Sequence, residues 1–272
     1  MTKKRNGALT TFIALFCILF LYAPLLSIAV FSVNESKTGL NWTGFTLHWY
    51  LQLFQNKYIQ RAALNTLFLA VVSTAISTAL GTAAAVGLYR HPWPRPVKRA
   101  MDMIMHLPVI TPDIVFAVAL ILVFSLLRAI SGFFELSMFT MVIGHITFQV
   151  AFVALVVYSR LEIIGHDIEE AAYDLYASYG RMLSKILLPM LVPGIMAGAM
   201  LAFTLSLDDF VISFFTSGPK STTLPLFIYA SLRRGVSPEI HALSTIIMIV
   251  TVAAIMLIQK VIGTDKTASL IG

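Results

Sequence analysis

The stretch EAAYDLYASYGRMLSKILLP, residues 170–189, holds two acidic and two basic side chains between two long apolar segments. Charged side chains are costly inside a lipid bilayer, so this stretch is expected to lie in water beside one. Its first residues, EAAYDL, have the pattern of a short helix with a face of small side chains, and ILLP at 186–189 leads back into an apolar segment. The pattern predicts a short helix that docks against another molecule.

The composition of the chain indicates an integral membrane protein. Of its 272 residues, 58% are hydrophobic and 12% are charged, and the mean hydropathy is +0.86. A soluble domain carries about twice that share of charge. The net charge of +6 does not indicate nucleic-acid binding, because the Lys and Arg residues lie between apolar segments rather than on one face. The single Cys17 excludes a disulfide or a Cys-based metal site within one chain.

Apolar windows long enough to cross a bilayer recur six times. A hydrocarbon core of about 30 Å needs roughly 20 apolar residues in a helix, and such windows lie at 10–33, 62–89, 101–127, 137–158, 190–215 and 241–262. They are too long and too continuously apolar for barrel strands, which alternate. We therefore predict an all-α integral membrane fold with six transmembrane helices. The first window is longer than the apolar part of a secretory signal, so we expect an uncleaved signal anchor.

The basic residues predict the orientation of the chain, because cytoplasmic loops retain Lys and Arg. With the N-terminus inside, twelve of the 19 Lys and Arg residues fall in cytoplasmic segments and seven fall outside. Six spans then place both termini, and residues 170–189, in the cytoplasm.

Two connecting segments have distinct patterns. Residues 34–61 contain Trp42, Trp49 and Tyr50, which suit the headgroup level and predict an interfacial helix on the outer side. Residues 90–99, RHPWPRPVKR, contain three prolines and are expected to form a basic cytoplasmic turn rather than a continuous helix.

Three acidic residues lie in apolar surroundings: Asp113, Asp208 and Asp209. On insertion scales each costs about 2.5–3.5 kcal/mol at a helix centre, so each is a candidate functional residue. Pro108 and Pro112 are expected to interrupt the third span beside Asp113 and to free backbone carbonyls there. The alternative is that these acids cap helices or pair with a basic side chain.

An acidic and aromatic lining would suit a flexible polycation. Cation–π contacts contribute about 0.5–2 kcal/mol each, and aromatic side chains follow the Asp208–Asp209 pair in the sequence. We predict a substrate pathway formed by Asp113, Asp208, Asp209, Phe210, Tyr229 and Glu239.

Other polar and small residues in the spans predict packing rather than chemistry. His145, Thr147 and Gln149 are expected to form interhelical hydrogen bonds worth about 0.6 kcal/mol each. Small side chains in the second and fifth spans are expected to let helices approach closely. They include Gly81, Gly87, Gly194 and Gly198.

The sequence lacks the motifs of common enzymes. The string GPKST at 218–222 lacks the glycines of a phosphate-binding loop, and Pro219 removes an amide donor. The six His residues have no metal-ligand spacing, and no GxSxG motif occurs. We predict a non-catalytic chain with no metal and no cofactor of its own.

The stretch at 170–189 resembles the EAA loop of type I ABC-importer permeases, whose short coupling helix docks on a cytoplasmic ATPase. Three further segments are similar to the spermidine/putrescine branch of that family: PDIVFAVALILVF from Pro112, SLDDFVISFFTSGP from Ser206 and TLPLFIYASLRRGVSPEIHALSTI from Thr223. The resemblance covers nearly the whole chain. It implies the type I permease fold and the import of a polyamine across a bacterial cytoplasmic membrane.

The resemblance also implies partners. A second, non-identical permease subunit would pair with this chain in the bilayer, and a dimeric ATPase carrying ATP and Mg²⁺ would dock beneath them. A polyamine-binding protein would deliver the substrate on the outer side. The implied coupling residues are Glu170, Ala171, Ala172, Asp174, Leu175 and Tyr176.

One position departs from the family pattern, which has a glycine six residues after the glutamate where this chain has Tyr176. Glycine adopts a positive φ readily, whereas a tyrosine there costs on the order of 1 kcal/mol. Two explanations are open: Gly180 takes over part of the turn, or the Tyr176 ring packs against the ATPase.

The resemblance divides the chain into three parts. Residues 1–60 hold the first span and the outer segment, 61–262 the permease core with the EAA loop at about 159–189, and 263–272 a short cytoplasmic tail. Three alternatives are open: a permease of the same class for ferric iron, sulfate or an amino acid; a secondary transporter or channel that acts alone; or an intramembrane enzyme.

Overall fold

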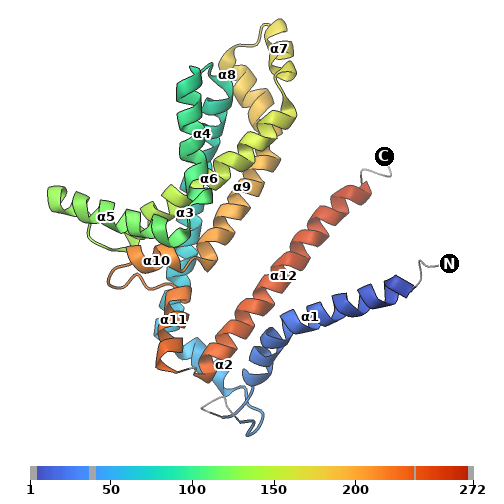
Figure 1. The fold of residues 1–272 in the computed structure, drawn as a ribbon, viewed down its shortest axis with the longest axis vertical. Coiled ribbons are helices and arrows are strands. Elements are labelled where there is room, and N and C mark those ends of the chain that lie inside the picture. Colours follow the sequence, from blue (N-terminus) through green and yellow to red (C-terminus); the bar gives the residue numbers. More distant parts are fainter. Residues whose placement is uncertain (1–4, 37–40, 236, 269–272) are drawn as a thin grey trace. The chain divides into compact units, whose positions relative to one another are not determined.

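A computed structural model describes residues 5–36, 41–235 and 237–268 of the protein (Figure 1). Lys3, Lys4 and Lys37, which are among the basic residues that predict the orientation of the chain, lie outside the described residues. The end of the predicted tail, 269–272, does so too. The chain divides into two compact units, one of residues up to 60 and from 228 onward, the other of residues 61–227. Each unit is described by itself.

The first unit contains two long helices and a short one, together with residues 228–234 at the end of a further helix. The long helices are α1 (Arg5–Phe31) and α12 (Pro238–Ala268), and α12 packs against both α1 and α2 (His48–Gln55). The helix predicted within 34–61 is therefore confirmed as α2. Trp49, however, is buried rather than outward-facing, and its Nε1 donates a hydrogen bond to the Asn34 carbonyl oxygen at 2.7 Å.

The second unit centres on α6, which packs against α4, α5, α9 and α10. Its helices, in chain order, are α3 (Lys57–Arg90), whose first residues belong to the other unit, α4 (Arg95–Ile110), α5 (Asp113–Ser131), α6 (Met138–Ile164), α7 (Asp167–Asp174), α8 (Tyr179–Met182), a π-helical turn (Leu183–Leu187), α9 (Leu188–Asp208) and α10 (Val211–Thr216). The helix α11 (Leu224–Arg234) contains the second boundary between the units.

Five described helices are long and apolar enough to cross a bilayer: Thr10–Phe31, Lys57–Arg90, Asp113–Ser131, Met138–Ile164 and Tyr179–Asp208. The apolar part of α12 with described side chains, Pro238–Ala253, is shorter. The predicted all-α membrane fold is confirmed. The predicted turn within 90–99 is confirmed too, because α3 ends at Arg90 and α4 begins at Arg95.

The interruption expected in the third span is confirmed at Pro112, whereas the predicted boundary of the fifth span is wrong. Within 101–127 the chain forms α4 and α5, with extended backbone at Thr111 (ψ 133°) before Pro112, and α4 continues through Pro108. Proline disfavours a helical residue before it, which explains this break. Instead of one helix over 190–215, α9 ends at Asp208 and Asp209 is extended (ψ 123°) before α10 begins.

Small side chains bring α3, α6 and α9 together, as predicted. Val153 of α6 is fully buried between two glycines. A Cβ atom at Gly81 of α3 would lie 2.8 Å from Val153 Cβ, and one at Gly198 of α9 would lie 3.2 Å from Val153 Cγ1. A Cβ atom at Gly194 would likewise lie 2.8 Å from Arg160 Cβ. Gly87 differs, since a Cβ atom there would meet nothing within 4 Å.

Polar side chains cross the same contacts. Gln149 Oε1 accepts a hydrogen bond from Ser77 Oγ at 3.1 Å, and Gln149 Nε2 donates to the Ala202 carbonyl oxygen at 3.1 Å. These bonds confirm the prediction for Gln149, and they matter because an unpaired buried polar group costs several kcal/mol in hydrocarbon. The prediction for Thr147 is wrong: its hydroxyl donates to the Ile143 carbonyl oxygen of its own helix at 2.7 Å.

We expect Gly81→Ala to destabilise the folded chain and Gly87→Ala not to do so. Both glycines lie in α3, but only a Cβ at position 81 would come within 2.8 Å of Val153 and 2.9 Å of the Val150 carbonyl oxygen. Overpacking costs about 1–3 kcal/mol, whereas replacing a helical glycine by alanine where there is room stabilises by roughly 0.5–1 kcal/mol. Thermal unfolding of the purified variants in detergent measures both effects. Equal midpoints for the two variants would contradict the close contact of α3 with α6.

Candidate functional site

The polar stretch begins where α6 ends at Ile164. Gly165 has a positive φ of 72°, which turns the chain, and α7 follows from Asp167 to Asp174. The predicted short helix is present, and it begins three residues before Glu170. Its first turn contains three acidic residues, which the positive end of the helix dipole stabilises.

One side of α7 faces inward and the other faces outward. Ala172, which is 3% exposed, packs in the core with Leu161 and Leu187. The other predicted coupling residues lie at the surface: Glu170, Ala171, Asp174, Leu175 and Tyr176. Leu175 is 82% exposed and Tyr176 is 96% exposed. Exposed apolar side chains beside a set of charges are typical of a protein–protein contact.

Tyr176 carries the turn after α7. Its φ is 55°, and its amide donates to the Tyr173 carbonyl oxygen at 2.8 Å, while the Ala177 amide donates to Ala172 at 3.0 Å. These bonds satisfy carbonyls at the end of the helix. Gly180 does not take over the turn, because it lies within α8 and its φ is not positive. Tyr176 therefore accepts the conformation for which the family pattern has a glycine.

A buried ion pair holds the inward side of α7. Arg90, the last residue of α3, contacts Glu169 through Nη2 and Oε1, and their side chains are 7% and 11% exposed. Neither Arg90 nor Glu169 was predicted to be a site residue. The sequence offers two weak signals for this pair: Glu169 is an acid next to Glu170, and Arg90 is an arginine at the end of an apolar span. No sequence pattern links two residues so distant along the chain.

The adjacent acids Asp208 and Asp209 have different surroundings. The Asp209 side chain is 12% exposed and accepts hydrogen bonds from the amides of Ile212 at 3.2 Å and Ser213 at 2.8 Å, which begin α10. His145 Nε2 lies 3.2 Å from Asp209 Oδ2. Asp208, the last residue of α9, is exposed.

His145 joins this break to the packed helices. Its Nδ1 lies 2.9 Å from Ser206 Oγ, and its Nε2 lies 3.1 Å from Ser213 Oγ. Ser206 Oγ in turn lies 3.3 Å from Ser73 Oγ of α3. The interhelical bonding predicted for His145 is confirmed. It extends to Asp209, which lies at the break between α9 and α10.

The remaining predicted pathway residues are divided between the two units. Asp113 begins α5 directly after Pro112, and its side chain is exposed. The Phe210 ring lies 5.4 Å from the Phe214 ring. Tyr229 and Glu239 belong to the other unit, where the Arg233 guanidinium lies 5.6 Å from the Tyr229 ring centre.

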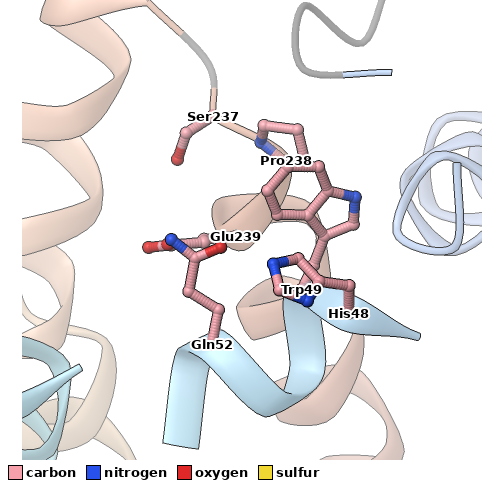
Figure 2. Close-up of a pocket in the computed structure, with 6 residues that line it drawn as sticks. All are labelled: His48, Trp49, Gln52, Ser237, Pro238 and Glu239. Carbon is pink, nitrogen blue, oxygen red and sulfur yellow. The ribbon is translucent and has the colours of Figure 1, made fainter. Parts of the chain in front are cut away.

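Glu239 lines a pocket of about 460 Å³ within the first unit. Figure 2 shows its lining, which comes from α2 and from the start of α12: His48, Trp49, Gln52, Ser237, Pro238 and Glu239. Asn56 Nδ2 donates a hydrogen bond to Glu239 Oε2 at 3.3 Å. Within the part of the chain that the structure describes, no three His, Cys, Asp or Glu side chains gather closely enough to hold a metal ion.

Comparison with known proteins places this arrangement in one class. Residues 77–264 match the family described as binding-protein-dependent transport system inner membrane component. The chain is 40% identical over 265 residues to the spermidine/putrescine transport system permease protein PotC of Escherichia coli strain K12, covering 97% of this chain and 95% of that protein. It is 41% identical over 230 residues to the putrescine transport system permease protein PotI of the same strain, covering 84% and 82%.

The fold agrees with these sequence matches. A chain in the crystal structure of a bacterial ABC transporter that imports the acidic polysaccharide alginate superposes with a TM-score of 0.76 at 19% identity, covering 96% of each chain. At that identity the likeness supports the fold alone, whereas the family match and the two relatives cover most of the sequence. The chain belongs to the family of binding-protein-dependent transport system inner membrane components.

Proposed function

We propose that this chain is a permease subunit of an ATP-driven importer of polyamines such as spermidine and putrescine. The single observation that carries the proposal is the 40% identity to a spermidine/putrescine permease over 97% of the chain. A substrate-binding protein outside the cell would deliver the polyamine. A second permease subunit would complete the pathway in the cytoplasmic membrane, with both termini of this chain in the cytoplasm.

The outward side of α7 is the proposed contact with a dimeric ATPase, which binds ATP and Mg²⁺. The exposed Leu175 and Tyr176 offer apolar area for that contact, and Glu170 and Asp174 offer charge. This chain needs no catalytic residue, because ATP binding on the partner need only favour one state of the pathway over another. The residues of α7 would carry that preference into the membrane.

The proposed pathway offers carboxylates to the ammonium groups of the substrate. Asp113 and Asp208 are exposed in the single chain and are available for this role. Asp209 already accepts hydrogen bonds from amides of α10 and contacts His145. We therefore propose that it stabilises the break between α9 and α10. A permease for sulfate would instead need basic groups at depth, which makes a cationic solute the better fit.

We expect proteoliposomes that hold the complete assembly to take up spermidine or putrescine only with ATP inside and binding protein outside. Glu170→Lys is expected to lower this uptake about tenfold or more. Reversing the charge at the docking surface should weaken the binding free energy of the ATPase by about 1.4 kcal/mol or more. The variant should still insert in the membrane, which membrane fractionation checks.

Uptake of sulfate, iron or an amino acid without polyamine uptake would exclude the proposed substrate. Uptake driven by an ion gradient in vesicles that contain this chain alone would exclude the ATPase partner. Unchanged uptake by the Glu170→Lys assembly would exclude the role of α7.

We expect the two replacements Tyr176→Gly and Tyr176→Ala to separate strain from docking. Only glycine adopts the positive φ of position 176 without strain. For tyrosine or alanine this conformation costs roughly 1 kcal/mol. Thermal unfolding should therefore rank the glycine variant above the alanine variant. Both variants lack the ring, so both should bind the ATPase more weakly in a pull-down from detergent. If both bind as well as the natural chain, the ring has no part in docking.

We expect Asp208→Asn to affect substrate uptake and Asp209→Asn to affect the stability of the fold. Asp208→Asn should raise the KM for polyamine uptake several-fold and change thermal stability by no more than about 0.5 kcal/mol, as exposed residues usually do. Asp209→Asn should lower stability by about 1–2 kcal/mol, because the charged acceptor of two amides and of His145 is lost. Uptake over a substrate concentration series and thermal unfolding measure the two effects. The reverse pattern would contradict the assignment.

A further inference from the structure

The short helix α7 has few attachments to the rest of its unit. Of its eight residues, only Glu169 and Ala172 are buried. Ala172 contributes a single methyl group to the core, so its packing alone holds α7 weakly. The ion pair between Glu169 and Arg90 is therefore the principal side-chain attachment of this helix.

The surroundings of the ion pair connect α7 to two other helices, α3 and α8, and to His166, which precedes α7. Arg90 ends α3, and its Nη1 lies 3.4 Å from the sulfur of Met182, the last residue of α8. His166, just before α7, has its Nδ1 at 3.9 Å from Glu169 Oε2. The His166 ring stacks on Tyr89 of α3, with ring centres 4.6 Å apart and planes 9° apart.

From this geometry we infer that Arg90 is a positioning residue that clamps α7 to the end of α3. A charge buried at this depth has no favourable position away from its partner, because water is excluded and separation leaves an uncompensated charge. The pair therefore holds α7 in one position relative to α3. The outward residues of α7 are presented on a fixed base, not on a loose loop.

The clamp gives the transport cycle a defined mechanical route, a step that rests on the proposed function. When an ATPase moves α7, Glu169 moves Arg90 and with it the cytoplasmic end of α3. Gly81 of α3 in turn packs against Val153 of α6. Ser73 of α3 is hydrogen-bonded to Ser206, which lies in α9 close to the break between α9 and α10. Breaking the pair should allow α7 to move without α3, so ATP hydrolysis would no longer be matched by transport.

The clamp can be tested in the purified chain without any partner. Cys17→Ser removes the single cysteine, and spin labels are then placed at Gly87→Cys on α3 and Asp174→Cys on α7, both at exposed positions. Double electron–electron resonance spectroscopy measures the distribution of distances between the labels. The matched control is Arg128→Met, which breaks an ion pair with Glu135 at 3.7 Å in which the side chains are 59% and 73% exposed.

We expect Arg90→Met to widen the distance distribution roughly twofold, because the remaining buried carboxylate draws α7 toward water. Glu169→Gln, which keeps the shape of the side chain, should widen it as well and serves if Arg90→Met does not fold. Arg128→Met should leave the distribution as narrow as in the natural chain. The charge-swapped double variant Arg90→Glu/Glu169→Arg should restore the narrow distribution. A narrow distribution for both single variants, or a wide one for the swap, would overturn the inference.

In proteoliposomes with the complete assembly, Arg90→Met should raise the ATP hydrolysed per polyamine imported by about fivefold or more, the lower range of typical coupling between sites. Arg128→Met should leave this ratio unchanged, and the charge swap should restore it. A natural ratio in Arg90→Met would overturn the mechanical route. If the natural assembly shows no ATP-driven uptake at all, the proposed function fails, while the label distances still decide whether the clamp exists.

Discussion

The contact of Val153 with Gly81 on one side and Gly198 on the other is the constraint on which the second unit depends. Helices in a bilayer gain little from hydrophobic burial against one another, so they associate through close van der Waals contact and hydrogen bonds. The two glycines let α3 and α9 approach α6 at one level. Because the backbones are close there, Gln149 reaches Ser77 and Ala202, which a wider spacing would prevent.

From that level the packing extends in two directions along α6. Toward the polar stretch, Leu161 of α6 and Leu187 belong to the core that receives Ala172. Toward the other end, His145 bonds to Ser206 and meets Asp209 at the break after α9. One packed helix thus connects the surface proposed to receive the ATPase with the acids proposed to meet the substrate.

Much of the fold could be predicted from the sequence because the bilayer imposes simple rules. Apolar runs of sufficient length, small residues and a proline-rich basic turn each correspond to the element predicted. The break at Pro112 was predicted from proline chemistry, although the same chemistry also predicted an interruption at Pro108, through which α4 continues. The break at Asp209 has no proline and arises because a carboxylate bonds the amides of Ile212 and Ser213 and meets His145, an arrangement that only the packed helices create.

The candidate site was less readable, because its details depend on pairs of residues distant in sequence. The short helix followed from a local pattern and its coupling residues from the family resemblance, and the positive φ of Tyr176 occurs where the family pattern has a glycine. The partner of Glu169 could not be found that way, since many arginines follow apolar spans and only the fold selects Arg90. The same holds for Trp49, which composition assigns to a membrane surface and which the fold buries against Asn34.

The π-helical turn at 183–187 gives the length of the polar stretch a meaning of its own. Such a turn contains one residue more than a regular helix needs. Deleting one residue there would make the helix regular and leave the flanking turns close to their present register, whereas deleting a residue from the regular helix beside it would rotate everything before it by about 100° around the helix axis and shift it by about 1.5 Å. The wide turn therefore absorbs a difference of one residue in the length of the polar stretch, and the orientation of α8 about the axis of α9 is preserved across it.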